Sequence, residues 1–379
     1  MDQPPLPTGL LRPALGAVDP YEPGRPIEAV QLELGLAEVV KLASNEGPFP
    51  PMPGAQQAIA DAAEGLRMYP DPGCWALRDA ISARTGVPSE CILPGNGVDS
   101  LIKLVCLATI DPGDQVVMGW PSFISWRQGA LMMGGEPVLV PLAPGGAYDL
   151  DAVLAAITPR TKLVVVVSPN NPTGAAVSAS ELEAFLDRVP AHVLTVLDEA
   201  YFEFLPPGSH DGAALMRAGR PLAVTRTFSK IYGLAGLRVG YLMAHPDLLS
   251  GLARVRNVFD VSALAQVAAI ASLAEADTHL PERFSLNVAE RARVDTAVRE
   301  LGLDPLPSDA NFLFIELGST ERANAAYEGL LQQGVIVRPA RGFGAPTAIR
   351  VTIGWPFDND RFLRVFQEIL PTLPQPATA

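Results

Sequence analysis

The sequence predicts an α/β fold: a large domain with a mostly parallel central sheet flanked by helices, followed by a smaller α+β domain. Two observations support this prediction. Along most of the 379-residue chain, short apolar runs alternate with stretches of helical periodicity, an order that favours a parallel sheet. Near the C-terminus the order changes, and two helix-like stretches precede several short strands.

Five apolar runs are the predicted strands of the large sheet. They cover residues 115–118, 163–167, 194–197, 222–227 and 239–243. Three of these runs are followed at once by polar or turn-forming sequence: "SPNNPTG", "DEAYFEF" and "FSKIYG". Because the carboxyl ends of parallel strands meet at one edge of a sheet, we expect these three segments to converge on one ligand site.

The remaining elements predict the domain organisation. Residues 262–276 and 281–302 are predicted helices, and 311–317, 334–339 and 349–354 are predicted strands. The first 40 residues are rich in proline and irregular, which is typical of an extended arm. We therefore expect an arm over 1–40 that joins the small domain or a partner subunit, a large cofactor-binding domain over 41–258 and a small domain over 259–379.

Charge and composition indicate the kind of ligand. The formal net charge is −13 without any basic cluster, which argues against nucleic acid or an anionic membrane as the partner and favours a small molecule. The N-terminal sequence lacks the features of a secretion signal, and the longest wholly apolar run, 163–167, is too short to span a bilayer. We expect a cytoplasmic protein. The three cysteines form no CxxC pair, and no metal site is expected.

Lys230 is the first candidate for chemistry. It follows an apolar run and precedes a glycine-rich segment, in "TFSKIYGLAGLRVGY". A free lysine titrates near pH 10.4, so a lysine at the end of a buried strand suits imine chemistry only if it is desolvated or already bound. Most lysines are solvated surface charges, and the neighbouring residues decide between the two readings.

Those neighbours suggest an anion site. Thr227 and Ser229 supply hydroxyls beside Lys230, and Arg238 supplies a planar fork that suits two phosphate oxygens. In "GNGVDS", residues 95–100, glycines precede a helix whose N-terminus would point at an anion. A plain glycine turn capped by Asp99 remains the alternative reading of that segment.

Three further residues follow predicted strands. Asp198 ends an apolar run, so its carboxylate needs a cation or a strong donor, and a protonated pyridine nitrogen is such a partner. Asn171 offers an amide and Tyr201 a phenol, and either could bond a ring hydroxyl. Taken separately, each is more often a turn or packing residue.

Taken together, ten ordered segments resemble the histidinol-phosphate aminotransferases, a family of fold-type I transferases that depend on pyridoxal phosphate. The matching segments are "DPYEPGRPIE" (19–28), "KLASNEGPFPP" (41–51), "RMYPDP" (67–72), "GNGVDSLI" (95–102), "PSFISW" (121–126), "SPNNPTG" (168–174), "LDEAYFEF" (197–204), "TFSKIYGLAGLRVGY" (227–241), "NFLF" (311–314) and "GVIVRPARGFGAPTAIRVTIG" (334–354). The resemblance runs along almost the whole chain.

The resemblance implies a role in cofactor binding for each matched residue. Lys230 would hold pyridoxal phosphate as an internal aldimine and later move the proton between the substrate Cα and C4′. Asp198 would keep the ring nitrogen protonated, Asn171 and Tyr201 would bond the ring oxygen, and Phe123 would stack on the ring. The cofactor phosphate would be bound by the backbone of Val98 and Asp99, by Thr227, Ser229 and Arg238, and by Tyr69 from the second subunit.

The resemblance also implies the substrates and a homodimer with shared active sites. Arg350 would bind the carboxylate of the amino-acid or oxo-acid partner, and Tyr21 and Arg338 would lie near the phosphate of histidinol phosphate. In a ping-pong cycle, glutamate would leave as 2-oxoglutarate, and imidazole-acetol phosphate would accept the amino group to give histidinol phosphate. The implied function is a step of histidine biosynthesis.

Two alternatives stay open at this point, and a third lacks a feature that it requires. An aromatic or broad-specificity aminotransferase shares the same motifs, and a phosphothreonine decarboxylase shares the fold and cofactor site. A regulator on the same fold would need a basic DNA-binding extension, which residues 1–40 do not offer. Gly47, Asp260 and Trp355 depart from the usual family pattern, so the substrate is less firmly predicted than the cofactor.

Overall fold

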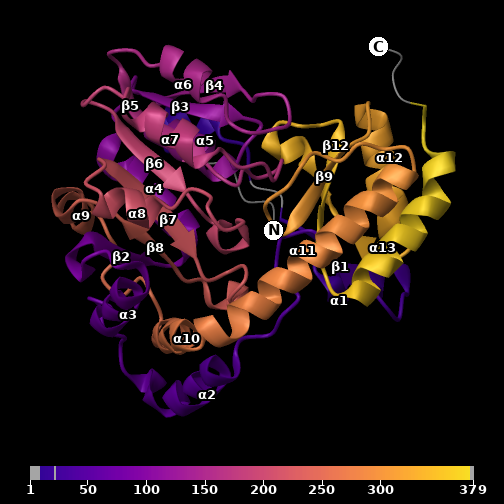
Figure 1. Ribbon diagram of the computed structural model, residues 1–379, viewed down its shortest axis with the longest axis horizontal. Helices are drawn as coiled ribbons and strands as arrows, with labels where there is room; N and C mark the ends of the chain where they lie inside the picture. The colour runs from indigo at the N-terminus through magenta and orange to yellow at the C-terminus, as the bar shows by residue number, and fades with distance from the viewer. Residues whose placement is uncertain (1–8, 21–22, 376–379) are drawn as a thin grey trace.

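The computed structural model describes residues 9–20 and 23–375. Figure 1 shows two lobes joined by the long helix α11 (Ala276–Glu300): a larger lobe built on a sheet and a smaller one in orange and yellow. Among the described residues, no helix combines the length and the apolar character that a bilayer crossing requires.

The large sheet is mostly parallel, as predicted. In the described part of the chain it has seven strands, in the order β2-β8-β7-β6-β5-β3-β4. Only β8 runs antiparallel to its neighbours. The strands are β2 (Ile92–Gly95), β3 (Gln115–Trp120), β4 (Glu136–Pro141), β5 (Thr161–Val167), β6 (Leu194–Asp198), β7 (Leu222–Thr227) and β8 (Gly240–Met243). The sequence missed β2 and β4, which contain prolines and lie at the two edges, where a proline is tolerated.

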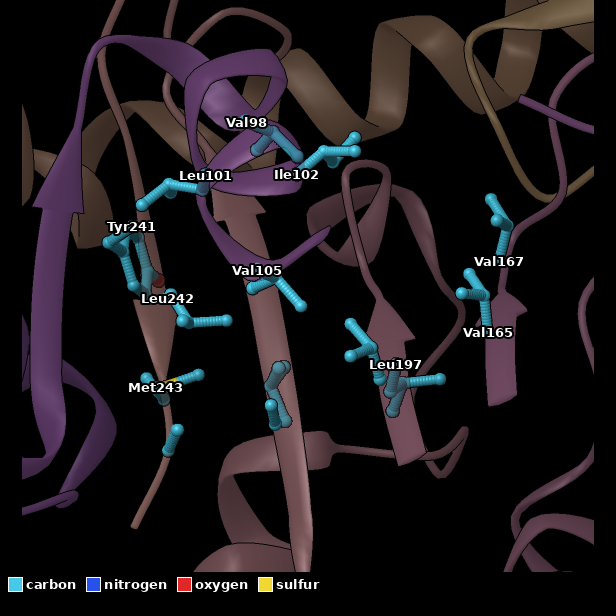
Figure 2. Close-up of a cluster of buried hydrophobic side chains, with 14 of the residues drawn as sticks. Val98, Leu101, Ile102, Val105, Val165, Val167, Leu197, Tyr241, Leu242 and Met243 are labelled. Atoms are coloured by element: carbon cyan, nitrogen blue, oxygen red, sulfur yellow. The ribbon is translucent and has the colours of Figure 1, made fainter. Parts of the chain in front are cut away.

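Helices cover the sheet on both faces (Figure 1). The helices of the larger lobe are α2 (Pro53–Ala62), α3 (Trp75–Thr85), α4 (Gly97–Thr109), α5 (Ile124–Met133), α6 (Leu150–Ala155), α7 (Ala179–Leu186), α8 (Gly212–Arg217), α9 (Pro246–Ala253) and α10 (Ala263–Ala274). Of these, α2 packs mainly against α10 instead of the sheet. Figure 2 shows how α4 packs: Leu101, Ile102 and Val105 point from one side of the helix toward β8 and its neighbours. Their helical spacing fixes this apolar side. Because β2 ends at Gly95 and α4 begins at Gly97, the helix N-terminus lies at the carboxyl end of that strand.

The smaller lobe contains two short sheets. One is antiparallel, in the order β11-β12-β9, from β9 (Phe312–Glu316), β11 (Arg338–Pro339) and β12 (Ala348–Thr352). In the other, β1 (Val40–Lys41) pairs with β10 (Val335–Ile336). The predicted single strand over 334–339 is therefore two strands in different sheets. The helices of this lobe are α1 (Ile27–Leu34), α12 (Thr320–Gln332) and α13 (Pro356–Ile369), with one end of α11.

The helix predicted to start at 281 starts earlier. α11 begins at Ala276 and contains Pro281, which lies in its second turn and removes only one backbone hydrogen bond there. The preceding helix, α10, packs against α2 and α3, and its buried residues belong to the core of the large lobe. We therefore propose that the boundary between the domains falls within α11 rather than at residue 259.

Candidate active site

A cavity of about 420 Å³ lies where three strand ends meet the N-terminus of α4. β5, β6 and β7 supply residues at or just after their carboxyl ends, as the sequence predicted, and Arg350 enters from β12 of the smaller lobe. The predicted residues that line the cavity are Val98, Asp99, Phe123, Asn171, Asp198, Tyr201, Thr227, Ser229, Lys230, Arg238 and Arg350. The fold therefore brings together most of the predicted site.

Lys230 lies three residues after the end of β7, with its amine facing this cavity. Its Nζ donates to the backbone oxygen of Ser44 at 3.2 Å and lies 5.7 Å from the centre of the Tyr201 ring. Burial, and then the positive charge of Arg350, lower the pKa of the Lys230 amine to about 8. At that pKa a useful fraction of the amine is neutral, and therefore nucleophilic, near neutral pH.

The lowered pKa predicts how Lys230 of the cofactor-free protein reacts with an amine-specific reagent. Because only the neutral amine reacts, labelling should rise from roughly a tenth of its maximum at pH 7 to about nine-tenths at pH 9. Mass spectrometry of the labelled peptides measures this, with exposed Lys162 as the control. If labelling of Lys230 still climbs beyond pH 9.5 in step with Lys162, the lowered pKa is wrong.

Asp198 ends β6 and is almost fully buried. Trp126 Nε1 donates to its Oδ2 at 2.8 Å, and the backbone N of Ala200 donates to its Oδ1 at 3.2 Å. Burial raises the pKa of Asp198 to about 6, although these two donors act against the shift. A cationic N–H donor in the cavity would restore the charged carboxylate, and a protonated pyridine nitrogen supplies one.

The polar side of the cavity is already ordered by hydrogen bonds. Asn45 Nδ2 donates to the Tyr201 hydroxyl at 2.8 Å, and Arg350 donates to the Asn171 side-chain oxygen and, at 2.6 Å, to the backbone oxygen of Ala43. Arg350 thus presents its guanidinium beside Asn171 and within the same cavity as Lys230. A substrate carboxylate is the planar anion that such a fork binds best.

The predicted anion site has a complete set of donors. Arg238 Nη1 lies 3.4 Å from Ser229 Oγ, and its Nη2 lies 3.4 Å from Asp99 Oδ2 at the start of α4. A Cβ on Gly97 would lie 2.6 Å from Arg238 Nη2, and the backbone there has a φ of +73°, so a larger residue would displace the guanidinium and strain the backbone. With the helix N-terminus, two hydroxyls and a guanidinium in one place, these residues fit a phosphate group.

Two of the predicted residues that the structure describes do not line this cavity. Tyr69 is 80% exposed and stacks on Phe259, with ring centres 4.4 Å apart. Arg338 pairs in register with Arg350, but lines a neighbouring groove instead. Tyr21 lies outside the described residues.

The residues that depart from the family pattern have structural contacts. A Cβ on Gly47 would lie 2.9 Å from the backbone oxygen of Lys230, so glycine allows a close approach there. Asp260 accepts from Asn96 N at 2.9 Å, next to the start of α4. Trp355 packs edge-on against Phe49, with ring centres 5.0 Å apart.

The sequence reasoning missed two residues that hold the site. Trp126 bonds Asp198, and Asn45 bonds Tyr201 from a left-handed backbone conformation (φ 54°). Both lie inside matched segments, "PSFISW" and "KLASNEGPFPP", which is the signal that could have found them. No cluster of metal-ligating side chains occurs within residues 9–20 and 23–375.

Comparison with known proteins places these observations in a family. Residues 37–366 match the family described as "Aminotransferase class I and II". A histidinol-phosphate aminotransferase of Moorella thermoacetica is 44% identical over 95% of this chain and 92% of its own length. An aromatic amino acid aminotransferase of Thermobifida fusca is also 44% identical, over 94% of this chain and 96% of its own length. The crystal structure of histidinol-phosphate aminotransferase from Sinorhizobium meliloti in complex with pyridoxal-5'-phosphate is 28% identical, has a TM-score of 0.87 and covers 97% of this chain and 99% of that one.

Proposed function

Because the chain belongs to the class I and II aminotransferases, we propose that it uses pyridoxal phosphate to transfer an amino group between histidinol phosphate and 2-oxoglutarate. The observation that carries the proposal is the convergence of Lys230, Asp198, Arg238 and Arg350 on one cavity. Lysine, carboxylate and the phosphate-binding set each match a different part of the same cofactor. Arg350 is left to bind the carboxylate of glutamate or 2-oxoglutarate.

The chain's own residues then have separate tasks. When bound, pyridoxal phosphate would supply an electron sink for the pair of electrons left as the substrate Cα loses its proton. Lys230 would hold the cofactor covalently and then, as a free amine, move that proton between Cα and C4′. Asp198 would hold the ring nitrogen in its protonated form, and Arg350 would fix the substrate carboxylate so that Cα faces Lys230.

A groove beside the active-site cavity supports a phosphorylated substrate. Arg25, Arg127, Arg338 and Arg341 line this groove together with Asp19, in a chain whose net charge is −13. The Arg338 guanidinium lies 5.5 Å from the centre of the Phe343 ring, which lines the Lys230 cavity. A distal phosphate reaching from the cavity toward this groove would meet cationic donors.

Replacing Arg338 by alanine tests the substrate. We expect kcat/KM for histidinol phosphate to fall roughly 10- to 150-fold. This corresponds to a loss of about 1.5 to 3 kcal/mol, the range for a hydrogen bond to a charged group. Glutamate carries no phosphate and should lose much less. Arg364→Ala, which removes an exposed arginine, serves as the control.

A panel of amino donors, followed through the cofactor absorbance, separates the rival function. The rival function is transamination of aromatic amino acids, and the sequence identity to the Thermobifida fusca aromatic aminotransferase supports it. If phenylalanine or tyrosine is the better donor and Arg338→Ala changes kcat/KM for neither histidinol phosphate nor glutamate, the aromatic assignment replaces ours.

The cytoplasmic location remains a prediction from the N-terminal sequence.

We propose further that the enzyme is a homodimer with shared sites. Leu66, Met68, Tyr69 and Phe259 are exposed and line one groove, an apolar surface of the kind that marks protein contacts. Arg238 lines both this groove and the Lys230 cavity. In a dimer formed across this groove, Tyr69 of the second subunit would lie near Arg238 and so near the cofactor phosphate.

Mixing two inactive variants tests this arrangement. Lys230→Ala and Tyr69→Ala subunits should each transaminate poorly alone. After co-refolding, mixed dimers contain one site with both residues intact, so about a quarter of the wild-type activity should return if dimers form at random. Mixed dimers with no recovered activity would show that Tyr69 does not act across subunits.

A further inference from the structure

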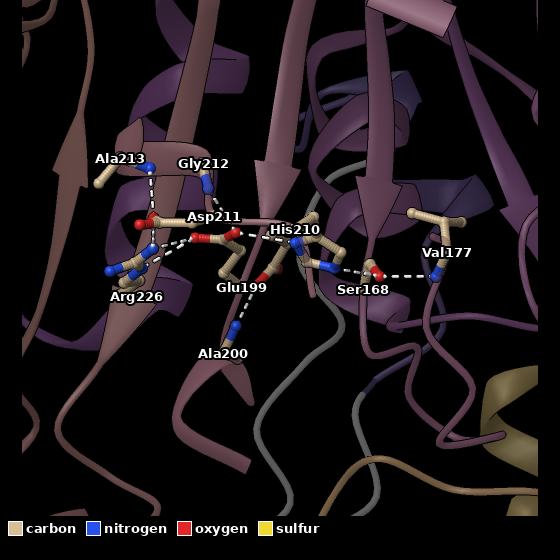
Figure 3. Close-up of polar contacts among 10 residues, drawn as sticks. Ser168, Val177, Glu199, Ala200, His210, Asp211, Gly212, Ala213 and Arg226 are labelled. Carbon is tan, nitrogen blue, oxygen red and sulfur yellow. Dashed lines mark hydrogen bonds and ion pairs between the residues drawn. The ribbon is translucent and has the colours of Figure 1, made fainter. Parts of the chain in front are cut away.

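A row of buried polar side chains lies behind the ends of β5, β6 and β7. Figure 3 shows Arg226, Glu199, His210 and Ser168 in contact one after another. Arg226 Nε donates to Glu199 Oε2 at 2.8 Å, His210 Nδ1 lies 3.1 Å from Glu199 Oε1, and His210 Nε2 lies 2.7 Å from Ser168 Oγ. None of the four lines the active-site cavity.

The tautomer of His210 with its proton on Nδ1 satisfies every partner in this row. Ser168 Oγ accepts from the backbone N of Val177 at 3.0 Å, so its own hydroxyl proton is available for His210 Nε2. Glu199 Oε1 accepts from the backbone N of Gly212 at 2.8 Å and is therefore oriented to accept from Nδ1 as well. Arg226 compensates the buried charge of Glu199.

The order serine, histidine, glutamate resembles that of a hydrolase, but burial excludes this role. Ser168 and Glu199 have no exposed surface and His210 is 2% exposed, so no substrate reaches the Ser168 hydroxyl. The row must act through the segments that it joins.

Those segments carry two residues of the active site. Ser168 begins the loop that carries Asn171, and its backbone N donates to the Asp198 backbone oxygen at 3.0 Å. Glu199 directly follows Asp198, and its backbone N donates to the Thr225 oxygen of β7 at 2.9 Å. Through Ser168 on one side and Glu199 on the other, His210 therefore connects the loop of Asn171 to the strand end of Asp198.

We propose that His210 is a positioning residue for transamination: it fixes the Asn171 loop relative to Asp198. This proposal rests on the proposed function only where transamination rates are measured. Asn171 and Asp198 line the same cavity and would contact different parts of the cofactor ring, so a shift of the loop would misplace one relative to the other. Misplacement of this kind lowers turnover without removing a group that touches the substrate.

Two variants of similar size separate this role from simple packing. His210→Leu removes both hydrogen bonds, whereas His210→Gln keeps a side-chain oxygen that can accept from the Ser168 hydroxyl. In the holoenzyme we expect His210→Leu to lower kcat about 10- to 100-fold with little change in KM, and His210→Gln to restore most of it. Exposed His192→Gln is the matched control.

Hydrogen exchange of residues 168–174 in the cofactor-free chain gives a readout that does not need activity. The loop amides should exchange faster in His210→Leu than in the wild type or in His210→Gln. If His210→Leu fails to fold, Ser168→Ala breaks the same contact from the other end and should show the same faster exchange. Unchanged exchange in both variants, or equal losses of kcat for leucine and glutamine, would overturn the proposal. A wild type without transaminase activity would refute the proposed function, and the exchange comparison would still decide the role of His210.

Discussion

Replacing Lys230 by alanine is expected to lower transamination by about 10⁴-fold, the upper range for the loss of a general acid-base group. The variant also loses the covalent attachment of the cofactor, so no other side chain can take over both tasks. Since the Lys230 side chain has one hydrogen bond, to the Ser44 backbone, its removal should leave the fold intact. Steady-state rates with glutamate and the oxo-acid acceptor measure the effect.

The matched control is Lys162→Ala, which removes an exposed lysine of β5 and should leave the rate unchanged. Thermal unfolding of both variants separates lost chemistry from lost structure. Loss of a general acid-base group lowers the rate by at least about 10²-fold. If Lys230→Ala keeps roughly a tenth or more of the wild-type rate, the catalytic role assigned to Lys230 is wrong.

Asp198→Asn is expected to have the next largest effect. The amide keeps the size of the carboxylate and can still accept from Trp126 Nε1, so the fold should persist. It carries no charge, however, and cannot hold the ring nitrogen protonated. Loss of one preorganised electrostatic contact to charge in the transition state typically lowers kcat by about 10²- to 10³-fold, and we expect a loss of this size.

Exposed Asp187→Asn is the control for this variant, because it removes the same group from a surface ion pair. The cofactor absorbance should also change in Asp198→Asn, since the protonation of the ring nitrogen alters the chromophore. Near-normal turnover of Asp198→Asn with glutamate would contradict the role assigned to this residue.

The residues at the strand ends of the site were predictable, because each lies beside a short apolar run and beside turn-forming sequence. Asp198 and Lys230 both follow runs of apolar residues that are too short for helices and are bounded by turn-forming sequence. Parallel strands bring such positions to one edge whatever the details of the helices. That rule explains why residues 32 positions apart in the sequence, 198 and 230, line one cavity.

The contacts around these residues could not be predicted in the same way. Trp126 and Asn45 act through side-chain hydrogen bonds that depend on packing between segments far apart in the chain. Apolar periodicity describes which side of a helix is buried, and it says nothing about which polar group a buried side chain meets. His210 shows the same limit, since its partners come from two other loops.

Predictions failed at short or proline-containing elements. The edge strands β2 and β4 were missed because their prolines argue against a strand, although an edge tolerates them. The sequence predicts a helix start at Pro281, but this residue lies inside α11, whose buried residues pack along both lobes. In each case tertiary packing outweighed the local signal.

Chemical trapping of the cofactor tests the central claim most directly. The purified protein should be yellow when loaded with pyridoxal phosphate, and borohydride should reduce the linkage between cofactor and protein to a stable bond. Digestion and mass spectrometry should then place the label on the peptide that contains Lys230. Label on Lys103, which lines the same cavity, or on Lys162 would contradict the account.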